Sequence, residues 1–275
     1  MKFLNRIIYY AYSIVEMLFG FKRFDKIVKI FLGKQMNEVH SIQLKNFPIS
    51  FYIRGKMDLW ALKETWLDKF YERHGIVIED GWHVIDIGAG YGDFCIRAAY
   101  KKPNTSVYAF EPFAESYNLL LRNIEVNKNE NIFSFPLAVW SKSGEIILDL
   151  TNGEPLQFST IEGSEKLITR EKTKKVQAIS LADLIHKNGI PKIDLMKIDC
   201  EGAEYEILRG CGAEILTKID RITMEYHDDF QGHTHDELVN LLSAHDFKVT
   251  CEENIVHDNI GYLYAIRNIS ADTPE

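Results

Sequence analysis

From Gly81 onward the sequence alternates between short apolar runs and segments with helical periodicity, and this alternation restricts the chain to few folds. The apolar runs are nearly continuous, as expected for strands that a sheet buries on both faces. They predict strands at about 83–87, 106–110, 131–135, 193–198, 220–226, 247–252 and 261–266, and helices near 92–101, 113–127, 180–187, 203–210 and 234–244. We therefore expect an α/β fold with a seven-stranded, mostly parallel sheet.

Two features modify this alternation. Only a loop, residues 253–260, separates the last two strands, so no helix can make a right-handed crossover and the final strand should be antiparallel to its neighbour. A polar stretch from about 138 to 178 interrupts the pattern and holds one further expected strand, Glu145 to Leu150. Insertions of this length often lie over an active site.

Residues 1–80 precede this region and have a different pattern, so we divide the chain into an N-terminal part, 1–80, and a cofactor-binding domain, 81–275. Met1 to Lys34 predicts two short amphipathic helices that break near Gly20 and Phe21. The runs 42–44 and 49–53 predict a hairpin, and Met57 to about His74 predicts a helix that Gly75 stops. Together these elements should cap the core.

The first 34 residues are basic, with seven Lys or Arg against two acidic residues. Their apolar stretch is interrupted by Glu16 and is shorter than the roughly 20 residues that span a bilayer. No cleavage site of a secretory signal follows it. A helical cap on the main domain and an interfacial membrane anchor both explain the pattern, and we favour the cap. We expect a cytoplasmic protein, with peripheral membrane contact through residues 1–34 as the alternative.

Composition and charge narrow the function. The chain is 46% hydrophobic and 26% charged, as in ordinary globular proteins. A net charge of −8 would repel a phosphate backbone, so we expect no nucleic-acid partner. The cysteines lack C-x-x-C spacing and predict reduced thiols, with neither a disulfide nor a zinc site; they are Cys95, Cys200, Cys211 and Cys251.

The first strand of the α/β region leads into a glycine-rich turn. Asp86 and Ile87 end the strand, and Gly88-Ala89-Gly90-Tyr91-Gly92 follows. A dinucleotide fingerprint needs a third glycine at position 93, where this chain has an aspartate whose charge would oppose a diphosphate. Glu111 ends the next strand and can accept hydrogen bonds from ribose hydroxyls. The pattern therefore favours S-adenosylmethionine as the cofactor.

Four segments resemble those of the FkbM-type methyltransferases: residues 86–94, Phe110-Glu111-Pro112, Leu137-Ala138-Val139-Trp140 and Lys197-Ile198-Asp199-Cys200-Glu201-Gly202-Ala203-Glu204. The resemblance implies a class I methyltransferase (Rossmann-like) fold and methyl transfer to a hydroxyl of a sugar, glycan or small-molecule acceptor. The cofactor-binding residues nominated by turn and resemblance are Asp86, Gly88, Ala89, Gly90, Tyr91, Gly92, Asp93, Phe94, Glu111, Pro112 and Ala138.

The acceptor side should lie across the crevice. Strand alternation places Lys197, Asp199 and Glu201 on one face, and places Glu225 and His227 together on the neighbouring strand. A hydroxyl acceptor must lose its proton to a nearby group, for which Asp199 and His227 are the candidates, with Lys197 and Glu225 positioning or tuning them.

Several alternatives stay open from the sequence. Lys197 could form a purely structural ion pair, and Asp199, Glu225 and His227 could bind a divalent metal, although we do not favour a metal. At the level of the whole protein, a nicotinamide-dependent oxidoreductase and a non-catalytic cofactor-binding scaffold are the rival hypotheses.

Overall fold

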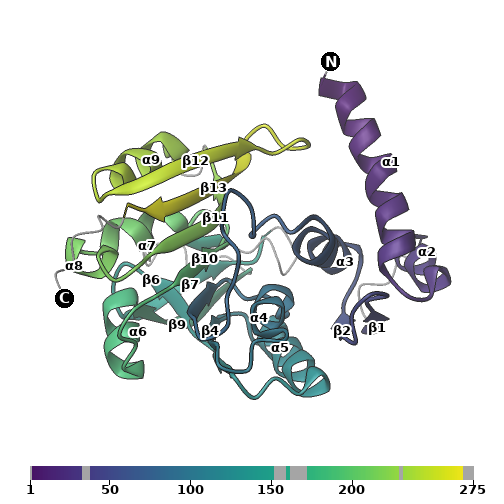
Figure 1. The fold of residues 1–275 in the computed structure, drawn as a ribbon, viewed down its shortest axis with the longest axis horizontal. Coiled ribbons are helices and arrows are strands. Elements are labelled where there is room, and N and C mark those ends of the chain that lie inside the picture. The colour runs from purple at the N-terminus through teal and green to yellow at the C-terminus, as the bar shows by residue number, and fades with distance from the viewer. Residues whose placement is uncertain (1, 33–37, 152–158, 162–171, 229–231, 269–275) are drawn as a thin grey trace.

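The computed structural model describes residues 2–32, 38–151, 159–161, 172–228 and 232–268. Its centre is a seven-stranded sheet of order β12-β13-β11-β10-β3-β4-β5 (Figure 1). The strands are β3 (His83–Ile87), β4 (Ser106–Phe110), β5 (Ile132–Phe135), β10 (Leu195–Ile198), β11 (Arg221–His227), β12 (Phe247–Glu253) and β13 (Ile260–Arg267). β13 is antiparallel to both β11 and β12, and the other pairs are parallel. The predicted mixed sheet is confirmed.

Helices cover both faces of this sheet, because successive strand residues point to opposite sides. On one face Val84 packs in a core with α4 (Asp93–Ala99) and α5 (Ala114–Asn127). On the other face Ile85 packs in a second core. The helices of that core are α6 (Leu181–Asn188), α7 (Glu204–Gly210), α8 (Ala213–Leu216) and α9 (His235–Ser243). The layered arrangement is the Rossmann-like α/β fold expected from the sequence.

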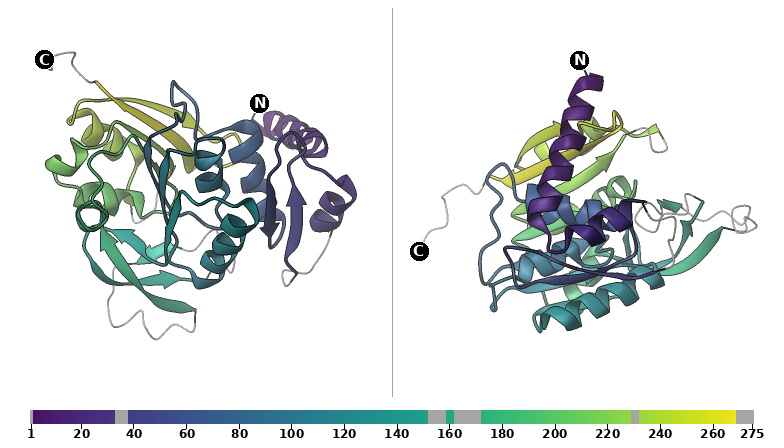
Figure 2. Two further views of the ribbon diagram at one scale, coloured as in Figure 1. Left: turned by 60° about the horizontal axis from the view of Figure 1, so that its bottom comes forward. Right: turned by 90° about the vertical axis from the view of Figure 1, so that its right-hand side faces the viewer.

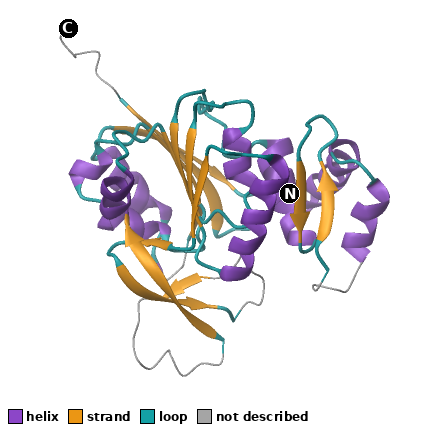
Figure 3. Cartoon of the chain, turned by 90° about the horizontal axis from the view of Figure 1, so that it is seen from below, coloured by secondary structure: helices purple, strands orange, loops and turns teal. Residues whose placement is uncertain are grey.

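The interruption after β5 is a second, smaller sheet. It has the order β6-β9-β7-β8, with β6 (Ala138–Trp140), β7 (Gly144–Asp149), β8 (Ser159–Ile161) and β9 (Thr173–Ser180). Only β7 was expected from the sequence. Figure 3 shows this sheet below the large one. Its apolar residues Ile146, Leu148 and Val176 pack into the core that contains Ile85, so it extends that face of the molecule.

The N-terminal part contains α1 (Lys2–Gly20), α2 (Phe24–Leu32), β1 (His40–Gln43), β2 (Ser50–Ile53), α3 (Lys56–Lys63) and a π-helical turn, Glu64–Asp68. The helix break and the antiparallel hairpin are confirmed. The helix predicted to His74 is wrong beyond Asp68, because Lys69 adopts a left-handed conformation with φ 56°. Phe70 and Tyr71, which continued the helical pattern, are buried instead by ring contacts with Tyr262 and Phe94.

Residues 40–80 are joined to the glycine-rich turn and to the helices α4 and α5 by buried and half-buried polar contacts. The Tyr91 hydroxyl donates to the Asp58 carbonyl over 2.7 Å, and the backbone N–H of Tyr52 donates to Asn123 Oδ1 over 2.7 Å. The Trp66 indole donates to the Asp93 carbonyl over 3.0 Å. These contacts fix α3 and the π-helical turn next to the glycine-rich turn. In the left view of Figure 2 the N-terminal elements, in purple and blue, lie at one side of the molecule.

Within the described residues, no helix is long and apolar enough to cross a membrane.

Candidate active site

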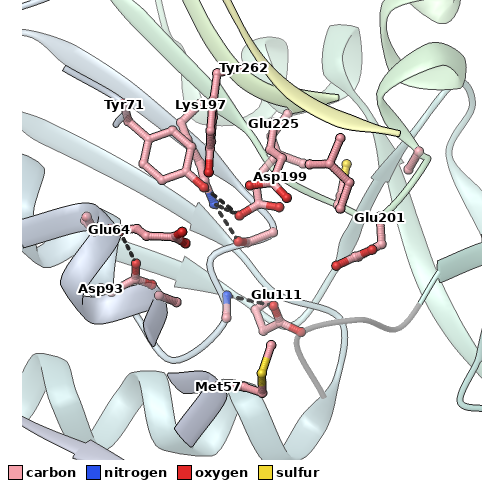
Figure 4. A pocket seen from close by; sticks show the side chains of 18 of the residues that line it. Met57, Glu64, Tyr71, Asp93, Glu111, Lys197, Asp199, Glu201, Glu225 and Tyr262 are labelled. Atoms are coloured by element: carbon pink, nitrogen blue, oxygen red, sulfur yellow. Dashed lines mark hydrogen bonds and ion pairs between the residues drawn. The ribbon is translucent and has the colours of Figure 1, made fainter. Parts of the chain in front are cut away.

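A pocket opens at the carboxyl ends of β3 and β10, the two central strands. The chain proceeds from β3 toward β5 on one side and returns to β10 on the other, and the crevice at such a reversal is where ligands bind in open α/β sheets. Side chains from β10, β11, the β4 end and the π-helical turn surround one space (Figure 4).

The glycine-rich turn lets β3 and β10 end close together. Gly88 has φ 73°, and a Cβ atom there would overlap the backbone oxygen of Asp199. Gly92 has φ 94°, and its Cβ would collide with Leu120 of α5. Both positions therefore require glycine. The backbone of Gly88 and Gly90 consequently forms a wall of the pocket without a side chain in the way.

Glu111 is held rigidly at the end of β4. Its Oε1 accepts the N–H of Phe113 and its Oε2 accepts the N–H of Gly90, both over 2.8 Å. Burial raises the pKa of Glu111 to about 7, although the two N–H donors lower it and so offset part of this effect. Each carboxylate oxygen keeps a lone pair for a second donor, so Glu111 can accept from a pair of ligand hydroxyls.

Lys197 is the buried cation of the site. Its Nζ donates to the Gly88 carbonyl over 2.8 Å and lies 3.1 Å from Asp86 Oδ1 and 3.7 Å from Asp199 Oδ2. Burial disfavours the charged ammonium, but Asp86, Asp199 and Asp93 outweigh it and raise the pKa of Lys197 above its ordinary value. Lys197 therefore remains charged and ties the glycine-rich turn to β10.

The pocket lining is strongly acidic. Six carboxyl groups line it, and Lys197 is the only lysine or arginine among its described lining residues; the acids are Glu64, Asp93, Glu111, Asp199, Glu201 and Glu225. Burial raises the pKa of Glu64 to about 7 and that of Asp93 to about 6. The pKa of Glu201 is raised to about 7 by burial, against the lowering effect of His227. Burial and the nearby Asp199 raise the pKa of Glu225 well above its ordinary value.

His227 lies behind this lining and does not reach the pocket. Its Nδ1 is 3.2 Å from Glu204, and its Nε2 is 3.3 Å from Glu201 and 3.6 Å from Glu225. Burial disfavours the imidazolium, but these three carboxylates outweigh it and raise the pKa of His227 well above its ordinary value. The structure thus brings together Lys197, Asp199 and Glu225 at the pocket and leaves His227 in the second layer.

The residues predicted to bind the cofactor also divide into those that line the pocket and those that lie behind it. Gly88, Gly90, Asp93, Glu111, Pro112 and Ala138 line the pocket, whereas Asp86, Ala89, Tyr91, Gly92 and Phe94 do not. Asp86 lies beneath the turn as the partner of Lys197. The Tyr91 ring points away from the pocket, toward Phe51 and the Asp58 carbonyl. Phe94 packs against Tyr71.

The sequence analysis missed the residues that the N-terminal part contributes to the pocket. Glu64, Thr65 and Tyr71 line it, as do Tyr10, Met57, Trp60 and Ala61. The Tyr71 hydroxyl donates to Asp199 Oδ2 over 2.7 Å, and the Thr65 hydroxyl donates to Asp93. The available signal was the polar pair Glu64-Thr65 within an otherwise apolar helical pattern. Among the described residues, no group of His, Cys, Asp or Glu has the arrangement of a metal site.

Comparison with known proteins gives one family and several relatives. The family described as Methyltransferase FkbM domain matches residues 86–249. The chain is 27% identical over 248 residues to the AMB antimetabolite synthetase AmbE of Pseudomonas aeruginosa. That match covers 76% of this chain but only 12% of AmbE. It is 25% identical over 241 residues to the 31-O-demethyl-FK506 methyltransferase FkbM of Streptomyces tacrolimicus, covering 78% of this chain and 92% of that protein.

Two further similarities cover a smaller part of this chain. The hexuronic acid methyltransferase AglP of Haloferax volcanii is 26% identical over 188 residues, covering 67% of this chain and 73% of that protein. The crystal structure of a methyltransferase FkbM from Methylobacillus flagellatus KT superposes with a TM-score of 0.48 at 16% identity. That match covers 72% of this chain and 47% of the other, so the chain spans about half the length of that protein.

Proposed function

This chain belongs to the FkbM methyltransferase family and is an S-adenosylmethionine-dependent methyltransferase, and from this premise we propose that it methylates a hydroxyl of a sugar-containing or other small-molecule acceptor. The choice of oxygen is supported by the 31-O-demethyl-FK506 methyltransferase named above, and a sugar-containing acceptor is supported by the hexuronic acid methyltransferase. The acid-rich pocket at the crevice of the sheet is the observation that carries the proposal.

The residues of the pocket fit the cofactor. S-adenosylmethionine carries a sulfonium and an ammonium, and six carboxyl groups around one lysine favour a cation. We propose that the backbone of Gly88 and Gly90 together with Glu111 holds the nucleoside, and that Asp93 and Glu64 attract the ammonium. When bound, the cofactor supplies a methyl group made electrophilic by the cationic sulfur.

On the acceptor side we propose that Asp199 orients the hydroxyl and takes its proton as the new C–O bond forms. Lys197 and the Tyr71 hydroxyl hold this carboxylate at the pocket wall, with 31% of its side chain exposed. His227 is a poor base in this arrangement, because three carboxylates keep it protonated. We assign it instead as a fixed positive charge that positions Glu201 and Glu204.

A pair of variants tests these assignments. Glu111→Gln should weaken binding of S-adenosylmethionine by roughly tenfold or more, because it reduces the accepting capacity at the nucleoside. Asp199→Asn should leave that affinity within a few-fold and lower the transfer rate by roughly 100-fold. Calorimetry measures the first effect, and transfer of a labelled methyl group to a panel of hexuronic acids, glycans and hydroxylated macrolides measures the second. Glu115→Gln, an exposed acid nearby on α5, is the matched control.

Two results would contradict the proposal. Binding of NAD without binding of S-adenosylmethionine or S-adenosylhomocysteine would exclude the cofactor assignment. Recovery of the label on nitrogen or carbon, identified by mass spectrometry and NMR of the product, would exclude the hydroxyl acceptor.

A further inference from the structure

The amphipathic pattern of α1 is the reverse of that expected for a helix packed on a globular protein. The stripe that faces the rest of the chain is largely polar and consists of Arg6, Tyr9, Ser13, Glu16, Met17 and Gly20. Ser13 accepts from Lys63 Nζ, and Glu16 forms an ion pair with the same lysine over 3.2 Å. The helix is thus attached to α3 by polar contacts along this stripe.

The outward face of α1 is apolar along its length. It presents Leu4, Ile7, Ile8, Ile14, Val15, Leu18 and Phe19, whose exposed fractions range from 37% to 69%. At 1.5 Å per residue the 19-residue helix is about 28 Å long, and it lies along one edge of the molecule (Figure 1). A helix in water normally turns such a face toward the protein core. Because this face points away from the core, we expect an apolar surface outside the chain to cover it.

The neighbouring helix adds a second exposed stripe. In α2, Phe24, Val28, Phe31 and Leu32 are exposed, with Leu32 at 79%, while Ile27 and Ile30 on the other side are buried. Lys22, Arg23 and Lys29 are exposed on and beside this helix. Residues 1–34 carry a net charge of +5 in a chain whose net charge is −8. Apolar faces bordered by basic residues match an anionic lipid surface.

We propose that the outward faces of α1 and α2 bind an anionic lipid bilayer and bring the pocket mouth to its surface. A second copy of the chain is a poorer occupant, because it would place two basic segments against each other. A bilayer would account for both the exposed apolar faces and the basic residues beside them, since the acyl chains contact the apolar side chains and the anionic headgroups pair with the lysines and arginines.

The pocket mouth lies next to this surface. Tyr10 of α1 lines the pocket, as do Asn254, Val256 and His257 from the loop between β12 and β13. Arg6 of α1 contacts Asp258 of the same loop over 3.2 Å, and Ile255 in that loop is 52% exposed. An acceptor anchored in the bilayer could therefore present its hydroxyl to the pocket. This step rests on the proposed function and narrows its acceptor to lipid-attached glycans or other membrane-held molecules.

Vesicle flotation tests the surface. The full-length chain should float with vesicles of phosphatidylcholine and phosphatidylglycerol at 3:1, and much less with phosphatidylcholine alone or at high salt. Ile7→Asp/Ile14→Asp should reduce the bound fraction at least tenfold. Leu121→Asp/Val126→Asp is the matched control, because these α5 residues are apolar and similarly exposed, at 42% and 41%. Melting temperature and S-adenosylhomocysteine binding verify that each variant is folded.

Depth measurement tests the orientation. In a Cys251→Ser background, a fluorophore at Ile255→Cys should be quenched by nitroxide-labelled lipids, whereas one at Val77→Cys, another exposed apolar position, should not. The proposal is overturned if the wild type does not float, if the α1 variant floats equally well, if sedimentation shows that this face instead joins two copies, or if Ile255→Cys is not quenched. Loss of S-adenosylhomocysteine binding with flotation intact would count against the proposed function alone.

Discussion

Lys197 is the residue on which the geometry of the pocket depends, because its contacts come from separate elements. It touches the Gly88 carbonyl, Asp86 at the end of β3 and Asp199 beyond β10. Asp86 is fully buried, so its charge is tolerated only with this partner. The ion pair therefore maintains the site even if it contributes little net stability over an apolar pair.

Replacing this lysine should be strongly destabilising. Lys197→Met leaves Asp86 buried without a counter-charge, and we expect the free energy of unfolding to fall by about 3–5 kcal/mol in urea denaturation. Lys192→Met, which removes a half-exposed lysine paired with Asp220, should change it by less than about 1 kcal/mol. Adding Asp86→Asn to Lys197→Met should restore part of the loss. Equal stability of wild type and Lys197→Met would show that the pair is not required.

At the residue scale, the sequence predicted those site residues whose role depends on the local backbone or on the end of a strand. Gly88 and Gly92 need positive φ and close backbone approach, and Glu111 follows from a strand end. Tyr91 could not be placed from the sequence, because its ring direction depends on contacts with Phe51 and Asp58, which lie more than 30 positions earlier in the chain. His227 could not be placed relative to the pocket from the sequence, because its ion pairs with Glu201 and Glu204 involve the chain that follows β10, and it does not line the pocket.

The π-helical turn is the element that the N-terminal part adds to the pocket. It places the Glu64 carboxyl in the pocket wall, where Oε1 accepts from the Trp60 indole over 2.8 Å. π-helical turns are often found at functional sites, because the inserted residue redirects neighbouring side chains. The sequence pattern predicted an uninterrupted helix here, since burial of Phe70 and Tyr71 continues the apolar periodicity after the helix has ended.

This element should affect how stability depends on pH. Burial raises the pKa of Glu64 from 4.5 to about 7, so between these values the folded chain holds a proton that the unfolded chain has lost. Its stabilising contribution is therefore complete below about pH 4.5 and is lost as the pH rises toward 7. Relative to Glu64→Gln, the ligand-free wild type should lose at most about 3 kcal/mol over this window.

Urea denaturation from pH 4.5 to 7.5 measures the effect. Glu130→Gln, which changes an exposed acid, should give a curve parallel to that of the wild type. If the Glu64→Gln curve were also parallel, the Glu64 carboxyl would not be held protonated in the folded chain.

At the scale of the whole molecule, charge is distributed unevenly in two ways. The basic residues Lys22, Arg23 and Lys29 lie beside exposed apolar helix faces, while the carboxyl groups of the pocket come from five regions of the chain. The large sheet was predictable, because each strand and helix has its own apolar pattern. The small sheet was not, because β6 and β8 are only three residues each, and β6 pairs with β9, about 40 positions later in the chain.

The collected acids lead to a prediction about ligand binding. At pH 6.5 several pocket carboxyls are partly protonated, since the pKa values of Glu64, Asp93, Glu111 and Glu201 lie at about 6 to 7. A bound cation stabilises their ionised forms, so S-adenosylmethionine should displace protons, on the order of one per molecule bound. S-adenosylhomocysteine has no sulfonium and should displace fewer.

Calorimetry at pH 6.5 in two buffers of different ionisation enthalpy measures the protons released, from the difference in observed binding enthalpy. Glu64→Gln should reduce the release, because it removes one titrating group from the pocket wall, while Glu130→Gln should not change it. Equal enthalpies in both buffers would mean that the acidic lining is already ionised in the free protein. Equal release by the two ligands would mean that the sulfonium charge does not affect these carboxyls. A greater release by S-adenosylmethionine would instead place the sulfonium charge among these carboxyls, as the methyl donor of this pocket requires.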